Sequence, residues 1–292
     1  MHEQITRSVC VEGWSVIASR AWIASRHASP TATCCPQRHA PSALLRDGHR
    51  GQNLAFYFDR LTHRFSVSHY GGYILKKVTE PISLAGSQLG EVRHVCAFFN
   101  NDEEEYRVLL PFIKNGFECG DKAVHVVNPD QRHDHLQRLA AAGIDHAAAE
   151  QSGQFELKIN TEAYLRDGRF DQDRMLAAFE QMASGNAKGG FPLSRICCRM
   201  DWAVEDQSYV DDLVEFESRV NDVWRRHDDA VICTYQLSKF GGGTVMDIMR
   251  THPMIIIGGI LYHNPFFVPA EIFLSELRER RARRTVSPAA AA

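Results

Sequence analysis

From His94 onward, short β-rich runs alternate with helical stretches, and this alternation leaves few folds open to the chain. Each apolar run of strand length is followed by a segment with apolar residues at helical spacing, and Gly, Asn or Pro separates the two. Strands that alternate with helices form parallel sheets, and their right-handed crossovers place helices on both faces. The sequence therefore predicts a three-layer α/β domain with one mostly parallel sheet.

The expected elements follow from this alternation. Strands are expected over residues 94–99, 123–127, 155–159, 195–200, 231–235 and 254–261, and helices over 102–117, 129–142, 171–188, 209–226, 244–250 and 269–284. Pro111 removes a backbone donor inside the first helix and is expected to kink it. Gly258 and Gly259 fall within or at the end of the last strand, where we expect a bend or a close backbone approach.

Residues 1–80 differ from the rest, because Arg, His, Ser, Cys and Pro recur there without a period of 3.6 or 2. We expect a disordered or poorly structured extension over 1–80, the folded domain over 81–284, and a disordered tail over 285–292. A strand pair over 54–57 and 73–78 is the alternative within the extension. Cys34, Cys35 and His39 lack a second ligand pair at zinc-finger spacing, so no metal knuckle is expected.

Composition argues against several functional classes. The chain of 292 residues has a formal net charge of -3, which disfavours a surface built mainly for nucleic acid or membrane. The longest apolar run, 254–261, is shorter than the roughly 20 residues of a spanning helix, and no secretory signal pattern begins the chain. We therefore expect a cytoplasmic protein with no membrane association and no direct nucleic-acid binding. The arginines within 278–284 are expected to form a solvated helix end, with contact to an acidic partner as the alternative.

The turn after the first strand does not have the composition of a phosphate loop. A phosphate loop needs glycines, whose backbone N–H groups surround the phosphates, and a lysine. Residues 99–105 read Phe-Asn-Asn-Asp-Glu-Glu-Glu, and these carboxylates would repel a triphosphate. The three glycines 241–243 lack a dinucleotide fingerprint and are interpreted as a loop or helix cap. The sequence thus predicts a nucleotide-binding type of fold with a degenerate phosphate loop and no ATP hydrolysis.

Polar and aromatic residues on an inward helix face and near strand ends are the candidate ligand-binding residues. Glu217 lies on the inward face of helix 209–226, and Asn221 follows one turn later. The pair either faces a ligand cavity or forms a buried hydrogen bond that holds the helix to a loop. Trp202 and Tyr235 lie near strand ends, where they would line an apolar pocket or cap the core.

Cysteine and histidine raise the question of a metal. His94 and Cys96 share one face of the first strand, and Cys198 and Cys233 lie on strands that could be its neighbours. Thiolate and imidazole are zinc ligands, but none of these residues has the paired spacing of a dedicated site. Cysteine inside an apolar run also behaves as a small hydrophobe. We therefore expect no metal ligands, no cofactor and no disulfide framework.

Several short motifs run through the chain in a fixed order. They are His94-Val95-Cys96-Ala97-Phe98-Phe99, Glu103-Glu104-Glu105-Tyr106, Met200-Asp201-Trp202-Ala203, Phe216-Glu217, Tyr235 and Arg250-Thr251-His252-Pro253. Together they resemble the MEDS family, the methanogen/methylotroph DcmR sensory domain, over about residues 81–277. That family is similar to RecA/KaiC-like ATPase domains without a working phosphate loop. The resemblance adds Arg250 and His252 to the positions that match recurrent family motifs.

The resemblance implies a sensory module that binds a small organic molecule and signals to an output protein. We expect a non-catalytic sensory domain that regulates a partner protein or transcription. The expected ligand-binding residues are His94, Glu104, Trp202, Glu205, Glu217, Asn221 and Tyr235. The alternative is a residual nucleotide-binding or hydrolytic enzyme of the RecA/KaiC-like class, which would use Asp201 or Glu205. No output-domain pattern is evident beside the family-like region.

Overall fold

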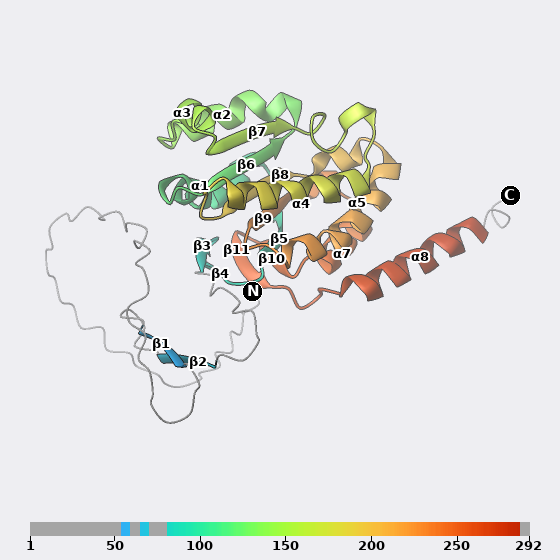
Figure 1. Ribbon diagram of the computed structural model, residues 1–292. Coiled ribbons are helices and arrows are strands. Elements are labelled where there is room, and N and C mark those ends of the chain that lie inside the picture. The colour runs from blue at the N-terminus through green and yellow to red at the C-terminus, as the bar shows by residue number, and fades with distance from the viewer. Residues whose placement is uncertain (1–53, 59–64, 70–80, 287–292) are drawn as a thin grey trace, which may run out of the picture. The chain divides into compact units, whose positions relative to one another are not determined.

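A seven-stranded sheet forms the centre of the fold in the computed structural model, which describes residues 54–58, 65–69 and 81–286 (Figure 1). In spatial order its strands are β11 (Ile260–His263), β10 (Met254–Ile257), β5 (His94–Phe99), β9 (Ala230–Gln236), β8 (Ser194–Arg199), β6 (Lys122–Val127) and β7 (Phe155–Ile159). All neighbours pair in parallel except β11, which is antiparallel to β10. The predicted mostly parallel sheet is confirmed.

Helices cover both faces of this sheet. The first face carries α4 (Gln172–Lys188), α5 (Gln207–Arg219), α6 (Asn221–Trp224), α7 (Gly242–Thr251) and α8 (Ala270–Val286), and the second carries α1 (Asp102–Glu118), α2 (Arg132–Ala141) and α3 (His146–Gln151). Along β5, Cys96 and Phe98 join the first core, whereas Val95, Ala97 and Phe99 join the second, as the two-residue period of a strand requires. The predicted three-layer α/β fold is confirmed.

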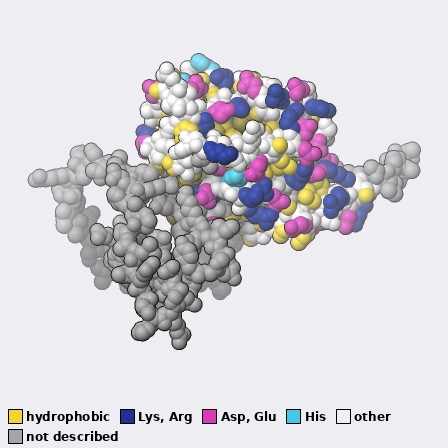
Figure 2. All heavy atoms as spheres, viewed as in Figure 1, with side chains coloured by type: hydrophobic (Ala, Val, Ile, Leu, Met, Phe, Trp, Pro, Cys, Tyr) yellow, Lys and Arg dark blue, Asp and Glu magenta, His cyan; other side chains and the backbone are white. Residues whose placement is uncertain are grey.

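The face that carries α4, α5 and α7 has mixed charge. In Figure 2, Lys and Arg side chains lie among Asp and Glu side chains, with hydrophobic side chains between them. Two arginines of α8 are used within the domain, because Arg280 pairs with Asp247 of α7 and Arg281 pairs with Glu215 of α5. These pairs attach the basic helix to the rest of the first face.

The helix α1 begins where the sequence places it. The Asn101 side chain caps the helix by accepting a hydrogen bond from the backbone N–H of Glu104 at 2.9 Å. Four acidic residues occupy the first turn, where the helix dipole favours negative charge. Pro111 lies inside α1, which continues through it to Glu118 as one helix.

The prediction of a single strand over 254–261 was wrong. The segment forms the antiparallel pair β10 and β11, because Gly258 and Gly259 adopt positive φ angles of 60° and 78° and turn the chain back on itself. The helix predicted over 209–226 also divides, with Val220 between α5 and α6. In the first segment the apolar pattern continues across a reversal of the chain, whereas Val220 keeps helical backbone angles (φ -67°, ψ -18°) between α5 and α6.

Two further strand pairs lie outside the main sheet. β1 (Leu54–Phe58), at the position of the first strand of the predicted pair, pairs with β2 (Phe65–His69). The hairpin of β3 (Ile82–Leu84) and β4 (Ser87–Leu89) was not predicted. Residues 73–78, Cys34, Cys35, His39 and 287–292 lie outside the described residues, whereas 285 and 286 belong to α8.

The remaining elements are single 3-10 turns, at Pro129–Gln131, Arg166–Gly168, Asp201–Val204 and Leu237–Lys239. Gly241 precedes α7 as its N-cap, in agreement with the helix-cap interpretation of the three glycines. Among the residues that the structure describes, no helix is long and apolar enough to cross a membrane.

Candidate functional site

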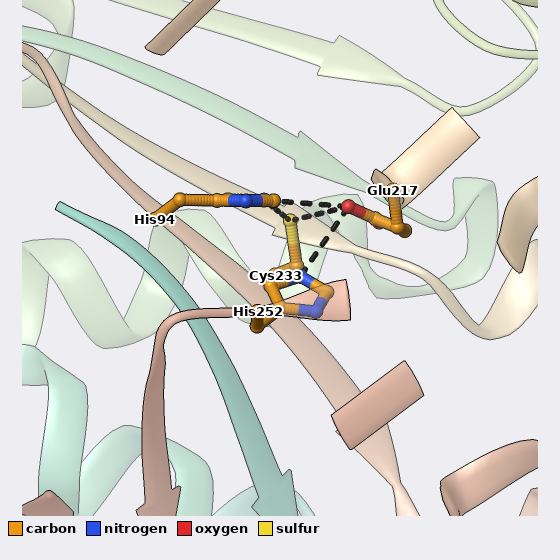
Figure 3. Close-up of side chains that lie close together, drawn as sticks. All are labelled: His94, Glu217, Cys233 and His252. Carbon is orange, nitrogen blue, oxygen red and sulfur yellow. Dashed lines mark hydrogen bonds and ion pairs between the residues drawn. The ribbon is translucent and has the colours of Figure 1, made fainter. Parts of the chain in front are cut away.

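Four polar side chains meet in the layer between the sheet and α5 (Figure 3). His94 begins β5, Glu217 projects from α5, Cys233 lies within β9, and His252 directly follows α7. One ligand atom of each side chain lies within 4.8 Å of those of the other three. All four side chains are buried, with exposed fractions of 2%, 0%, 4% and 0% in the same order. We refer to these four residues as the α5 cluster.

The Glu217 carboxylate is at the centre of the α5 cluster. Its Oε2 atom lies 3.3 Å from Nε2 of His94 and 3.3 Å from Nε2 of His252. The Sγ atom of Cys233 lies 3.8 Å from the same oxygen and 3.7 Å from Nε2 of His94. Four potential donor atoms of three chemical types therefore face one small volume.

A second layer of hydrogen bonds orients the α5 cluster. Asn221 Oδ1 lies 2.9 Å from Nδ1 of His94, and the Tyr235 hydroxyl donates to Oε1 of Glu217 at 2.9 Å. The Nδ1 atom of His252 lies 2.9 Å from the Ile248 carbonyl oxygen. Both imidazoles are thus held by Nδ1, so that Nε2 points at Glu217.

Burial and neighbouring charges shift the pKa values of these groups. Burial raises the pKa of the Glu217 carboxyl, but His252 and His94 outweigh that effect and hold it below its ordinary value. Burial, and then the neighbouring His252, lower the pKa of His94. Burial and the charge of Glu217 raise the pKa of the Cys233 thiol well above its ordinary value. The Cys233 thiol therefore lacks the lowered pKa of a reactive cysteine.

A second polar network occupies the carboxyl edge of the sheet, where ligands bind in doubly wound folds. Arg199, the last residue of β8, pairs with Asp102 at 2.8 Å and with Glu105 at 2.6 Å. Lys239 pairs with Asp201 at 3.0 Å, and Asp201 also lies 3.7 Å from Arg199. We refer to these five residues as the edge network. Because both cations there already pair with carboxylates, this edge differs from a phosphate loop, as the sequence predicted.

The structure brings together His94, Glu217, Asn221 and Tyr235 of the expected ligand-binding residues. The other three lie elsewhere. Glu104 accepts hydrogen bonds from the backbone and side-chain nitrogens of Asn100, both at 2.8 Å, beside the start of α1. Trp202 is fully buried and stacks on Tyr164 at 4.9 Å, and Glu205 is exposed.

Cys233 and His252 complete the α5 cluster. Cys233 precedes Tyr235 by two residues on the same strand face, and His252 matched a recurrent motif in the family resemblance. Cys96 and Cys198 occupy the same register as Cys233 on the neighbouring strands, yet neither belongs to the cluster. The other motif residue, Arg250, pairs with Glu276 at 2.7 Å.

A groove beside α4 is a separate feature that sequence patterns did not indicate. It has a volume of about 390 Å³ and lies between α4 and the strands β6 and β7. Its apolar lining includes Val124, Val126, Met175, Phe179 and Met182, and its charged lining includes Glu156, Lys158, Glu162, Arg166 and Arg174. None of the expected ligand-binding residues lines this groove.

The parallel sheet, the helices on both its faces and the ion-paired edge define a three-layer α/β domain without a phosphate loop. Residues 93–253 match the family described as MEDS, the MEthanogen/methylotroph, DcmR Sensory domain, and the chain belongs to this family. Among solved structures, the chain is similar to a KaiC-like protein from the hyperthermophilic archaeon Pyrococcus horikoshii. The two share 13% identity with a TM-score of 0.44, over 62% of this chain and 80% of the other. No curated protein matches the chain.

Proposed function

We propose that the chain is a non-catalytic sensory domain that binds a small organic molecule in the groove beside α4 and regulates a partner protein or transcription. Membership of a sensory family supports the general role. The groove is the observation that supports binding of a small molecule. Its volume of about 390 Å³ falls within the range of about 300–1,000 Å³ that small-molecule sites occupy.

The lining of the groove favours a ligand with an apolar body and a polar group. Val124 and Val126 of β6 and Phe179 of α4 provide buried apolar contacts. At the charged lining, Lys158 pairs with Glu156 at 2.9 Å, and Arg174 donates to the backbone carbonyls of Arg166 and Arg169 at 3.0 Å. Because both side chains of the Lys158–Glu156 pair are partly exposed, the pair is weak, and a polar group of a bound ligand would exchange with one partner while its apolar part is buried.

The helix beside the groove is connected to α5. Gln172 of α4 donates to Asp212 of α5 at 3.3 Å and accepts from Arg219 of α5 at 3.0 Å. Arg219 also pairs with Asp173 of α4. If α4 has two positions and a ligand binds only one of them, the ligand would change these contacts between α4 and α5. A partner protein that contacts α5 would then respond to the ligand.

The edge network supports a non-catalytic role over a residual nucleotide hydrolase. Asn101 and Glu104 already cap the start of α1, and Arg199 and Lys239 already pair with carboxylates. A triphosphate would need to displace these carboxylates before it gained a cation. Among the described residues, no contact at this edge favours the alternative enzyme.

Thermal unfolding of the full chain with small organic molecules and with nucleotides tests this function. Ala178→Trp would fill part of the groove, because Ala178 is an exposed groove residue of α4. Ala177→Trp is the matched control, since Ala177 is exposed on the same helix and does not line the groove. We expect an organic ligand to stabilise the unchanged chain and the control but not Ala178→Trp. Stabilisation by magnesium-ATP alone, or ligand binding retained by Ala178→Trp, would contradict the proposal.

A further inference from the structure

The hydrogen bonds of Asn221 determine which nitrogen of His94 carries a proton. The Asn221 side-chain nitrogen donates to three backbone carbonyls, those of Glu217, Ser218 and Thr251, at 3.0, 3.2 and 2.8 Å. Its Oδ1 atom is therefore an acceptor, and the neighbouring Nδ1 of His94 must be the donor. In the neutral imidazole, Nε2 of His94 then presents a lone pair toward Glu217.

His252 is oriented in the same way. Its Nδ1 atom lies 2.9 Å from the Ile248 carbonyl oxygen, which can only accept, so Nδ1 carries the proton and Nε2 presents a lone pair when the ring is neutral. That Nε2 atom has no hydrogen-bond partner among the described residues, although His252 is 0% exposed. When both rings are neutral, two imidazole lone pairs and a carboxylate oxygen face one another, which is unfavourable unless a proton or a metal cation lies between them.

Four of the six distances between ligand atoms of the α5 cluster match a tetrahedral metal centre, and all six are within 4.8 Å. Bonds of about 2.0–2.3 Å to nitrogen, oxygen and sulfur place the ligand atoms of a tetrahedral Zn²⁺ roughly 3.3–3.8 Å apart. The two nitrogen–oxygen distances are 3.3 Å, the sulfur–nitrogen distance is 3.7 Å, and the sulfur–oxygen distance is 3.8 Å. Two imidazoles, one thiolate and one carboxylate are also donors that suit zinc.

We infer that His94, Glu217, Cys233 and His252 bind a zinc ion inside the domain. All four positions of the tetrahedron come from the protein, which is the pattern of a closed structural site. The charges balance, because the +2 ion meets one carboxylate, one thiolate and two neutral imidazoles. Binding forms a bond from zinc to Cys233 Sγ, and the thiol proton is released to solvent.

The surroundings of the α5 cluster provide the outer hydrogen bonds that metal sites require. Asn221 and the Ile248 carbonyl hold the two imidazoles by Nδ1, and the Tyr235 hydroxyl holds the carboxylate oxygen that faces away from the other three ligands. The ion would join β5, β9 and the segment before β10 to α5. This inferred zinc site contradicts the sequence-based expectation of no metal. The site shares no residue with the groove beside α4.

The metal content of the full chain gives the first test. Protein is purified without chelators and without a metal-affinity step, and its zinc content is measured by inductively coupled plasma mass spectrometry. We expect about one zinc per chain in the unchanged protein and in Cys198→Ala, and a several-fold lower content in Cys233→Ala. Cys198 is the matched control because it is buried and lies directly beside Cys233 in the sheet.

Cobalt substitution tests the ligand set and does not depend on the metal that the cells supplied. After chelation and addition of Co²⁺, the folded unchanged chain and Cys198→Ala should show intense tetrahedral absorption bands and a thiolate-to-cobalt charge-transfer band. Cys233→Ala should lose the charge-transfer band, and Glu217→Gln should bind Co²⁺ at least tenfold more weakly. A folded unchanged chain without zinc and without these bands, or equal metal binding by Cys233→Ala, would overturn the inference. Ligand binding in the groove is measured separately, so either proposal can fail alone.

Discussion

The edge network and the α5 cluster are both built around buried ionisable side chains, but only the edge network contains its own permanent cations. At the edge, Arg199 and Lys239 meet the carboxylates of Asp102, Glu105 and Asp201. Under α5, the Glu217 carboxylate meets a thiol and two imidazoles. Arginine and lysine provide permanent positive charge at the first site, whereas we infer that the second site takes its cation from outside the chain.

This difference indicates how the two ends of the sheet are used. The edge is where the fold places phosphate ligands, and here it is closed by ion pairs. In the α5 cluster, His94 begins β5 and His252 precedes β10. These two residues therefore lie at the amino ends of the strands, opposite the carboxyl edge. The candidate ion site therefore lies in the layer between the sheet and α5, and not at the carboxyl ends of the strands.

The largest expected loss of stability comes from a substitution that breaks the edge network. Arg199→Met leaves Asp102, Glu105 and Asp201 without their shared cation, and we expect a loss of about 3–5 kcal/mol in the free energy of unfolding. Arg138→Met is the control, because Arg138 pairs with Glu103 and Asp134 at the surface and should cost about 1 kcal/mol or less. Urea denaturation measures both. A loss for Arg199→Met no larger than that of the control would show that the edge network is not a buried charge site.

The pH dependence of the edge network comes next in size. Burial raises the pKa of Glu105 to about 7 despite Arg199, since Asp102 and Asp201 compete for the same cation. The contribution of Glu105 to stability is then fully present below its unfolded pKa of 4.5 and is lost as the pH rises through about 7. Relative to Glu105→Gln, the unchanged chain should lose about 2–3 kcal/mol between pH 4.5 and pH 8. Denaturation of both proteins at the two pH values measures this, and a constant difference would refute it.

A smaller loss of stability is expected from a substitution beside the α5 cluster. Tyr235→Phe removes the hydroxyl that donates to Glu217 and leaves a buried carboxylate oxygen unsatisfied. We expect a loss of about 2 kcal/mol in the free energy of unfolding and a metal affinity lower by about 10–100-fold. Tyr209→Phe is the control, because its hydroxyl makes only a long, 3.3 Å bond to the Gly168 carbonyl at the surface. Equal effects of the two changes would remove Tyr235 from the cluster's supporting shell.

The smallest expected effect concerns Glu104, which sequence reasoning included among the ligand-binding residues. Its carboxylate accepts two hydrogen bonds from Asn100 beside the start of α1. Glu104→Ala should cost about 0.5–1 kcal/mol in the free energy of unfolding and leave ligand and metal binding unchanged. Calorimetry with any ligand of the groove checks the second part. Loss of ligand binding would return Glu104 to the binding site.

Local patterns were sufficient for much of the fold. The alternation of strands and helices, the Asn101 cap and the acidic turn all depend on neighbours in sequence, and each is present in the structure. The bend expected at Gly258 and Gly259 is present, but it is a full reversal of the chain, which was missed because apolar residues continue on both sides of the two glycines. A pattern of hydrophobicity contains no backbone angle.

The α5 cluster was only half predictable for a similar reason. Helical spacing places Glu217 and Asn221 on one face, and the strand period places Cys233 beside Tyr235. Whether His94 meets Cys233 and His252 depends on β5 lying between β9 and β10, and strand order is a property of the whole sheet. The groove beside α4 likewise depends on how α4 packs on β6 and β7.

The most direct test of the central claim compares the two sites in one measurement, the thermal unfolding of the chelated full chain with Zn²⁺ or with magnesium-ATP. Zinc at about 100 times its Kd adds roughly 2.7 kcal/mol, which raises the Tm of a domain of this size by about 5–10 °C. We predict this increase with zinc and no change with magnesium-ATP, because the edge network already contains its cations. An increase with magnesium-ATP and none with zinc would contradict the account.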